Sequence, residues 1–167
     1  LKRHAVCFFS LSGQKLGLIG LHLKSNPSDA QANAQRTAEA AIVRRIVQRE
    51  IIGRDYLPII LGDVNDYDPD VEMADSKRKT ETTVLRILKD SNPQQDGDQL
   101  INVASRIPRV ADRFSSHWDY NENGAADGDD VFTLIDHILI SKKLAEGLTR
   151  AFICHANCLE ISDHFPV

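Results

Sequence analysis

Leu61-Gly62-Asp63-Val64-Asn65-Asp66 follows the apolar pair at 59–60 and places polar side chains where a buried strand is expected to end. Two other segments have the same form, Gly20-Leu21-His22-Leu23-Lys24-Ser25 and the terminal Ser162-Asp163-His164-Phe165-Pro166-Val167. A charged or imidazole group beside a core costs free energy unless it is paired, hydrogen-bonded or bound to a metal. Three such positions in one small domain therefore predict a shared active site.

Composition narrows the function classes. The chain has 167 residues, 42% of them hydrophobic and 26% charged, which suits one soluble globular domain. A net charge of −4 argues against a passive nucleic-acid binder, but not against a nuclease, because a metal can neutralise phosphate locally. The first residues contain neither an initiator Met nor a signal-peptide pattern. We expect the middle of a longer chain, and the compartment, secreted or cytoplasmic, stays open.

Hydrophobic periodicity predicts alternating strands and helices. The helix expected over 32–52 has an apolar stripe and ends at Gly53 as its C-cap. The stripe consists of two neighbouring ladders, one of Ala38, Ile42 and Ile46 and one of Val43, Val47 and Ile51. A strand, a helix and a further strand indicate an α/β fold. The other elements are strands over 4–9, 16–23, 59–61, 114–118, 132–140 and 151–154, and a helix over 81–90.

The apolar strand at 132–140 contains an acidic residue. Because side chains alternate along a strand, Asp136 is expected to share a face with Leu134 and Ile138, and His137 the opposite face. A carboxylate among aliphatic side chains needs a partner, and an imidazole such as His164 is the natural one. The alternative is that Asp136 caps a loop or pairs with an arginine.

Asp63 and Asn65 come two residues apart just after a strand. If the chain is still extended there, both side chains point the same way and could hold an oxygen-preferring cation with a phosphate or a water. The alternative is an Asx turn that closes the strand. At the C-terminus, Asp163 could bind a divalent metal while His164 takes a proton from water, and His22 could donate to a phosphoryl oxygen.

The cysteines suggest no further site, and the basic residues Lys24, Arg36, Arg44, Arg45 and Lys77-Arg78-Lys79 could form local basic patches. Cys7 is expected to be a small core residue, and Cys154 and Cys158 lack the second cluster that a structural zinc site needs. Arg36 and the other basic residues of the predicted helix are read as solvated surface.

The order of these segments resembles the endonuclease/exonuclease/phosphatase (deoxyribonuclease I-like) superfamily. The matching segments are Leu21–Ser25, Gln35-Arg36 with Glu39-Ala40, Leu61–Asp66, Leu134–Leu139 and Ser162–Val167. The resemblance implies part of a four-layered α/β sandwich, with mixed, mainly antiparallel sheets flanked by helices. Residues 1–167 would form one domain that lacks its N-terminal part, where the family carries its metal-binding Glu.

The resemblance also implies a divalent-metal phosphoesterase that needs Mg²⁺ or Mn²⁺. His164 would be the general base, oriented by Asp136, and water would attack phosphorus in line. The other roles would fall to Asp63 and Asn65, which position water, metal or phosphate, to His22, which contacts the phosphoryl group, and to Asp163, which helps bind the metal.

A nuclease acting on nucleic acid as a monomer is the first choice of function. The sequence lacks the segments typical of inositol phosphatases, and we recognise no aromatic hairpin of the kind expected for a sphingomyelinase. The alternative is a phosphatase or phosphodiesterase that acts on small-molecule or lipid-headgroup phosphoesters.

The segment 119–130 fits much of a calcium-binding loop. The oxygen-bearing residues at its positions one, three, five, nine and twelve are Asp119, Asn121, Asn123, Asp127 and Asp130, and Gly124 stands at position six. Ala126 at position eight, the short Asp130 and the lack of an entering helix depart from the pattern. An acidic turn-rich loop is the alternative. If the loop binds Ca²⁺, the non-enzymatic alternative is a binding module similar to a dockerin or EF-hand protein.

Overall fold

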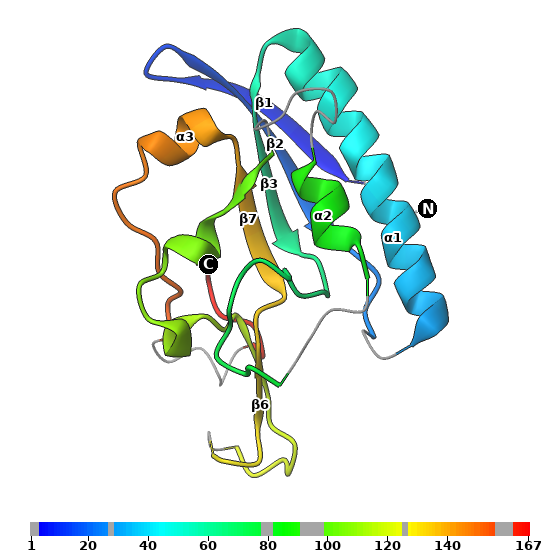
Figure 1. Ribbon diagram of the computed structural model, residues 1–167, viewed down its shortest axis with the longest axis vertical. Helices are drawn as coiled ribbons and strands as arrows, with labels where there is room; N and C mark the ends of the chain where they lie inside the picture. The colour runs from blue at the N-terminus through cyan, green and yellow to red at the C-terminus, as the bar shows by residue number, and fades with distance from the viewer. Residues whose placement is uncertain (1–3, 27–28, 78–81, 91–98, 125–126, 156–161) are drawn as a thin grey trace.

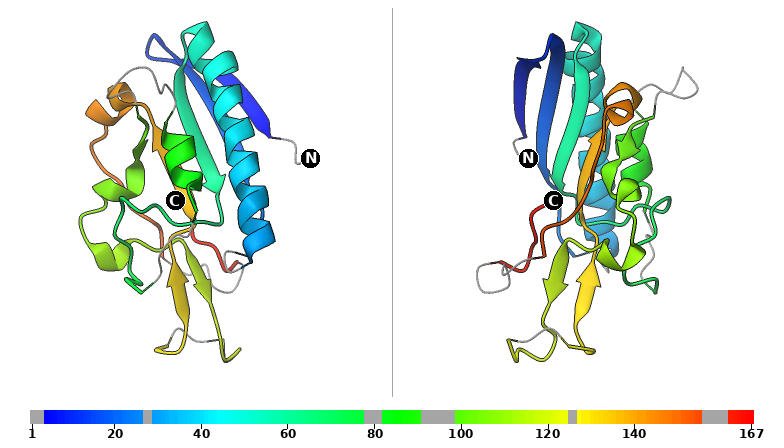
Figure 2. Two further views of the ribbon diagram at one scale, coloured as in Figure 1. Left: turned by 45° about the vertical axis from the view of Figure 1, so that its right-hand side comes forward. Right: turned by 90° about the vertical axis from the view of Figure 1, so that its left-hand side faces the viewer.

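A mixed sheet with helices on one face forms the body of the molecule, and a two-stranded hairpin projects from one end (Figures 1 and 2). The computed structural model describes residues 4–26, 29–77, 82–90, 99–124, 127–155 and 162–167. The strands are β1 (Ala5–Leu11), β2 (Gln14–His22), β3 (Leu57–Asp63), β4 (Ile101–Asn102), β5 (Ser116–Trp118), β6 (Val131–Thr133) and β7 (Asp136–Ile140). The α-helices are α1 (Ala30–Ile46), α2 (Val84–Lys89) and α3 (Lys142–Glu146).

The five-stranded sheet has the order β1-β2-β3-β7-β4. β2 and β3 run parallel, and the other pairs are antiparallel. The sheet is therefore mixed and mainly antiparallel, which confirms the predicted fold class. β2 and β3 end at the same edge of the sheet, and β7 begins there because it runs in the opposite direction.

The long helix packs on one face of this sheet. Asp29 caps its start, because Asp29 Oδ1 accepts a hydrogen bond of 2.6 Å from the backbone N–H of Ala32. The predicted stripe is confirmed for the ladder of Val43, Val47 and Ile51, which is buried. The neighbouring ladder lies at the margin of the core, with Ile42 and Ile46 half-buried and Ala38 exposed. The predicted continuous helix is wrong at its end: the chain passes through a π-helical turn at Val47–Ile51 and a 3₁₀ turn at Ile52–Arg54. Asp55 at φ 61°, rather than Gly53, then reverses the chain.

The core lies between the sheet and α1 with α2. The fully buried side chains from the strand side are Ile19, Leu23, Ile60 and Leu139, and those from α2 are Val84, Leu85 and Leu88. These residues alternate along their strands, as a half-buried sheet requires. A second core cluster around Leu134, Ile153 and Phe165 packs beneath the loops beside the hairpin.

The opposite face of the sheet is apolar and lies away from α1 and α2. Alternation places Leu18, Ile59 and Ile138 on this open face, and each is only half-buried. A hollow of about 590 Å³ lies over its β3–β7 part, lined by Ile59, Ile138 and Ile140 and by the segments near 103–107 and 148–154. Of the predicted four-layered sandwich, the described residues form one helix layer, the five-stranded sheet and the separate two-stranded β5–β6 sheet.

The predicted single strand over 132–140 is two strands in different sheets. β6 pairs with β5, whereas β7 pairs with β3 and β4. The break falls at Leu134, whose side chain packs in the second core cluster. The Ser115 hydroxyl accepts hydrogen bonds from the backbone N–H groups of Ile135 (3.1 Å) and Asp136 (2.9 Å). A continuous strand would need these two N–H groups for pairing with its neighbours, so the strand is interrupted here.

Two further sequence predictions are wrong. Cys7 is exposed, because it lies on the edge strand β1 and points away from the core. The segment 151–154 forms no strand; Cys154 makes a backbone hydrogen bond to the Pro166 carbonyl (2.9 Å) outside any sheet. The predicted strand at 114–118 is shortened to β5. Cys158 lies outside the described residues.

The contact between β2 and the π-helical turn generates a stability prediction. A Cβ at Gly17 would lie 2.5 Å from Ile51 Cγ2, whereas a Cβ at Gly20 on the same strand meets nothing within 4 Å. We expect Gly17→Ala to lower the free energy of unfolding by about 1–3 kcal/mol through overpacking. Gly20→Ala, the matched control, should leave it unchanged or raise it by up to about 1 kcal/mol. Urea unfolding measures both, and equal effects would contradict this account of the packing.

Candidate functional site

Three polar side chains lie in a row across the edge where β2 and β3 end and β7 begins. His22 is the register partner of Asp63, and Asp63 is the register partner of Asp136. Neighbouring strands are about 5 Å apart, and directly paired residues project from the same face. The sheet thus brings together an imidazole and two carboxylates that are far apart in the sequence.

His164 adds a second imidazole to this row. Its Nδ1 lies 2.8 Å from Asp136 Oδ2, and the Ser115 hydroxyl donates to the same oxygen at 2.8 Å. Because that hydroxyl already accepts two backbone N–H groups, its own proton is directed at the carboxylate. Asp136 therefore fixes the His164 ring through Nδ1 and leaves Nε2 as the nitrogen that can take up a proton.

The environment of this row shifts the pKa values of His164 and Asp63. Burial alone would lower the pKa of His164, but the hydrogen bond to Asp136 and the charges of Asp136 and Asp63 outweigh it and raise the pKa. Burial raises the pKa of Asp63, and the neighbouring charge of Asp136 raises it further. The row therefore favours the uptake of a proton or a cation.

A tight turn after β3 positions Asp63 and Asn65. Gly62 has φ 128°, and a Cβ there would lie 2.2 Å from the Leu21 carbonyl oxygen, so the position requires glycine. Asn65 is left-handed at φ 53°, which overturns the expectation of an extended chain. Its backbone N–H donates to Asp63 Oδ1 (2.8 Å) and its side-chain amide to Asp63 Oδ2 (2.7 Å). The two side chains meet through an Asx turn, the alternative that the sequence left open.

The other two predicted site residues lie at the rim. The His22 side chain is 73% exposed, and its Nε2 is 3.7 Å from Asp63 Oδ2. Asp163 is exposed, and its charge is among those that raise the pKa of His164. Its backbone carbonyl accepts a hydrogen bond of 2.8 Å from the His117 N–H, which ties the C-terminal segment to β5.

The predicted calcium loop forms the tip of the β5–β6 hairpin. Strands flank it on both sides, so the helix–loop–helix of an EF-hand is not formed in this part of the structure. Its side chains bond mainly to their own loop: Asp119 accepts from the Asn123 and Gly124 N–H groups, and Asp127 from Asn121. Asp130 pairs with His117 at 2.6 Å. Calcium binding by this loop stays a prediction.

The donor set at the strand edge suits a hard divalent cation. Carboxylate and amide oxygens are the ligands that Mg²⁺ and Mn²⁺ prefer, and two carboxylates beside each other attract positive charge. Among the described residues, no group of three or more His, Cys, Asp or Glu is arranged to hold a metal ion. The described residues of this edge therefore do not by themselves form a complete metal site.

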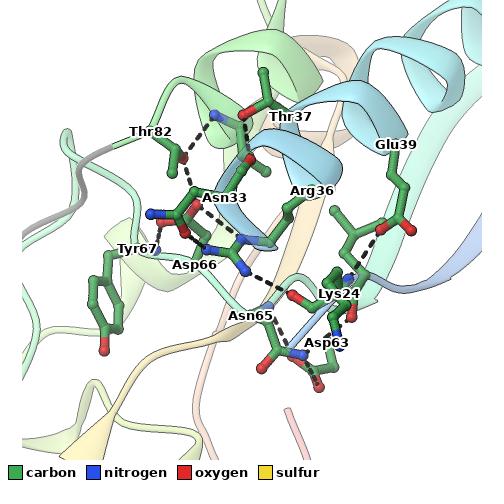
Figure 3. Close-up of polar contacts among 12 residues, drawn as sticks. Lys24, Asn33, Arg36, Thr37, Glu39, Asp63, Asn65, Asp66, Tyr67 and Thr82 are labelled. Atoms are coloured by element: carbon green, nitrogen blue, oxygen red, sulfur yellow. Dashed lines mark hydrogen bonds and ion pairs between the residues drawn. The ribbon is translucent and has the colours of Figure 1, made fainter. Parts of the chain in front are cut away.

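Arg36 holds the loop after β2 against the loop after β3, although its sequence position was read as surface (Figure 3). It is fully buried. Its guanidinium donates to the Lys24 carbonyl (2.7 Å), to Asp66 Oδ2 (3.2 Å) and to Asn33. Glu39, one turn along α1, accepts from the Lys24 N–H at 2.9 Å. The spacing of Arg36 to buried Ala40 and Val43 is the signal that could have placed it inward.

His137 also holds the loop after β3 in place. Its Nε2 donates to the Asp66 carbonyl (2.9 Å), so its Nδ1 accepts from the Asn102 amide at 3.0 Å. Burial lowers the pKa of His137, and the ring is therefore neutral. Asn102 also donates to Asp68 at 3.0 Å, and Lys89 pairs with Asp68 at 2.7 Å. Sequence reasoning placed His137 opposite Asp136 but missed its role.

Comparison with known proteins identifies the fold. No family model and no curated protein matches the sequence. Among solved structures, the 3′ phosphatase NExo from Neisseria bound to a product DNA hairpin superimposes with a TM-score of 0.65 and 20% identity. An AP endonuclease from Archaeoglobus fulgidus gives 0.65 and 18%, and D. rerio TDP2 complexed with a single-strand DNA product gives 0.55 and 18%.

Each of these matches covers 96% of this chain but only 57–62% of the other protein. All three proteins belong to the endonuclease/exonuclease/phosphatase superfamily. The chain therefore has the DNase I-like fold, as its sequence predicts, and it spans about three fifths of the length of these neighbours.

The Asp136–His164 contact predicts a pH-dependent effect. We expect Asp136→Asn to lower the pKa of His164, measured by NMR titration of the histidine ring protons. A raised pKa in the folded protein stabilises it fully below about pH 6.5, and this contribution is lost as pH rises through the raised pKa. Asp136→Asn should remove that pH dependence of unfolding. Asp129→Asn at the hairpin tip is the control, and an unshifted His164 in Asp136→Asn would refute the coupling.

The Arg36 contacts predict a large loss of stability on truncation. Arg36→Met leaves a buried carboxylate at Asp66 without its guanidinium, so we expect the free energy of unfolding to fall by about 3–5 kcal/mol. Arg45→Met, on the exposed side of the same helix, should change it by less than about 0.5 kcal/mol. Denaturant unfolding of both variants checks this, and similar values for the two would argue against the clamp.

Proposed function

We propose that the chain is the general-base portion of a metal-dependent phosphoester hydrolase that acts on nucleic acid. The observation that carries this proposal is the Asp136–His164 hydrogen bond of 2.8 Å at one end of the His22–Asp63–Asp136 row. An imidazole held through Nδ1 by a carboxylate, with a raised pKa, is suited to take a proton from water near neutral pH. The DNA present in two of the similar structures supports nucleic acid as the substrate.

His164 would act by removing a proton from the attacking water. As the water oxygen forms its bond to phosphorus, the proton moves to His164 Nε2, and the ester oxygen on the opposite side leaves with the electron pair of the broken bond. Asp136 stabilises the imidazolium that forms and keeps the ring in place. Ser115 holds Asp136 in turn, through the hydroxyl described above.

The other row members would bind and orient the phosphate and the water. Asp63 is held rigidly by the two hydrogen bonds from Asn65, so it can position a water or a cation without reorganisation. His22 is exposed and close to Asp63, where its imidazole can donate to a phosphoryl oxygen. When bound, Mg²⁺ or Mn²⁺ beside Asp63 and Asp163 would neutralise the charge on the phosphoryl oxygens.

The open sheet face supports the proposal that residues 1–167 are one part of a longer domain. The face presents half-buried aliphatic side chains around a hollow of about 590 Å³, and such patches in soluble proteins mark contact surfaces. The similar structures extend well beyond the region that matches. We propose that a preceding segment covers this face and supplies the missing metal ligands, so that the isolated chain binds Mg²⁺ weakly and turns over little substrate.

Hydrolysis of terminal phosphomonoesters is a second candidate within the same chemistry. One similar structure is described as a 3′ phosphatase, and the same base and row would serve a monoester as well as a diester. Small-molecule or lipid-headgroup phosphoesters remain the alternative substrates.

The test uses the complete gene product with plasmid DNA, RNA, a 3′-phosphorylated oligonucleotide and lipid phosphoesters. We expect cleavage of nucleic acid that EDTA abolishes and added Mg²⁺ restores. His164→Ala should lower kcat by a factor of about 10²–10⁴, the usual contribution of a general base.

Arg45→Met, far from the row on exposed helix surface, is the matched control and should retain full activity. A His164→Ala protein that cleaves as fast as the parent would exclude the base assignment. Robust Mg²⁺-dependent cleavage by residues 1–167 alone would refute the partial-domain proposal.

A further inference from the structure

The β5–β6 hairpin contains a buried ionisable pair that the proposed mechanism does not use. The side chains of His117 and Asp130 are 5% and 0% exposed, and His117 Nε2 lies 2.6 Å from Asp130 Oδ2. An aspartate is ionised near neutral pH and its carboxylate can only accept, so His117 Nε2 donates this hydrogen bond. Removing the imidazole would leave the buried carboxylate without this donor.

The pair joins the two strands of the hairpin diagonally. His117 opposes Phe132 in the register, and Asp130 comes two residues before Phe132, on the same side of the hairpin. The His117 ring stacks on Phe132 with centroids 4.7 Å apart and planes 18° from parallel. In the described part of the chain, the hairpin is a separate two-stranded sheet, and such hairpins are marginally stable alone. Contacts between side chains therefore help to hold its strands together.

Each strand of the hairpin is connected to one member of the Asp136–His164 pair. β6 ends only three residues before Asp136. On the other strand, Ser116 opposes His164 in an isolated bridge between two backbone hydrogen bonds of 2.8 Å. The His117 N–H donates one of these to the Asp163 carbonyl. The residue that closes the hairpin with its side chain thus holds the neighbour of the proposed base with its backbone.

A series of aromatic contacts links the same pair to the C-terminal segment. Phe132, which stacks on His117, meets Phe114 edge to face with centroids 5.0 Å apart, and Phe114 meets Phe165 at 5.4 Å. Phe165 is buried and directly follows His164. A displacement of the His117 ring can therefore reach the proposed base through packed side chains as well as through the backbone.

We propose that His117 and Asp130 are positioning residues that set the separation between Asp136 and the His164 ring, without contact to the substrate. This inference rests on the proposed function, because it assigns to the pair the alignment of the proposed base. The alternative is a pair that stabilises the hairpin and leaves the site unaffected. A displacement of a catalytic group by 1 Å can lower a rate by about 10²-fold, so activity separates the two.

The pKa of His164 reports the alignment without any catalysis. In the complete gene product, we expect His117→Ala to lower this pKa, because a displaced ring loses part of its contact with Asp136. His117→Gln should retain the parent value, since the glutamine amide can donate to Asp130 from about the position of Nε2. His117→Asn, one carbon shorter, should act like His117→Ala. NMR titration of the histidine ring protons measures these values, and an unchanged pKa of His164 in the Ala and Asn variants would overturn the proposal.

Kinetics with nucleic acid and Mg²⁺ give the second readout. We expect His117→Ala to lower kcat by about 10–100-fold and to change KM by less than about twofold, since the pair aligns the base and does not bind substrate. His117→Gln should recover most of kcat. Asp129→Asn at the hairpin tip is the control and should keep the parent kcat. A raised KM with an unchanged kcat in His117→Ala would make the pair a substrate contact and contradict the proposal.

A second control tests whether a loss of stability alone produces these effects. Gly17→Ala overpacks the contact with Ile51, away from the hairpin, and should keep the parent kcat and the parent pKa of His164 below its unfolding temperature. An equal loss of kcat in Gly17→Ala and His117→Ala would show that the pair is only structural. If His117→Ala does not fold, the comparison of the Gln and Asn variants decides by the same criteria.

Two outcomes distinguish this inference from the proposed function. If His164→Ala loses activity as expected but the His117 variants keep the parent kcat and the parent pKa of His164, the positioning role is wrong and the hydrolase proposal stands. If no phosphoester is cleaved, but the pKa of His164 falls in His117→Ala and is restored in His117→Gln, the pair positions the imidazole and the hydrolase proposal fails instead.

Discussion

The antiparallel pairing of β3 with β7 sets Asp63 and Asp136 opposite each other at the edge of the sheet. At the spacing of paired strands, two like charges repel by roughly 3 kcal/mol at the effective dielectric of a protein surface. Two features of the fold reduce this repulsion. Burial and the charge of Asp136 raise the pKa of Asp63, and His164 gains affinity for a proton through Asp136. A row that attracts protons and cations is the physical basis of the proposed chemistry.

The row is useful only if the loops that carry it are held still. The turn after β3 contains a left-handed Asn65, and such conformations cost free energy that surrounding contacts must offset. Arg36 and His137 both hydrogen-bond to Asp66, the first to its side chain and the second to its backbone carbonyl. Among the described residues, the hydrogen bonds of these two side chains go to Lys24, Asn33, Asp66 and Asn102. They hold the chain at Asp66, three residues after Asp63, and so limit where Asp63 can point.

Sequence reasoning succeeded where local pattern and long-range structure agree. The apolar stripe of α1 and the buried strand before Gly62 have periodicities that only one packing satisfies. It failed at Cys7 and at the supposed strand over 132–140, because exposure depends on sheet order and the break at Leu134 depends on a hydroxyl from Ser115, nineteen residues earlier. It also missed the aromatic hairpin, since the exposure of Trp118 follows from β5 leaving the main sheet.

By itself, the sequence determined the residue types at the strand ends and the α/β class, because these follow from composition and spacing along the chain. Its motifs also resemble those of the DNase I-like superfamily. Only the tertiary structure decided that His22, Asp63, Asp136 and His164 share one edge, that Arg36 is buried and that Trp118 points into water. The physical reason is that strand order and register are set by the packing of the whole core. Residues distant in sequence become neighbours only when that packing forms.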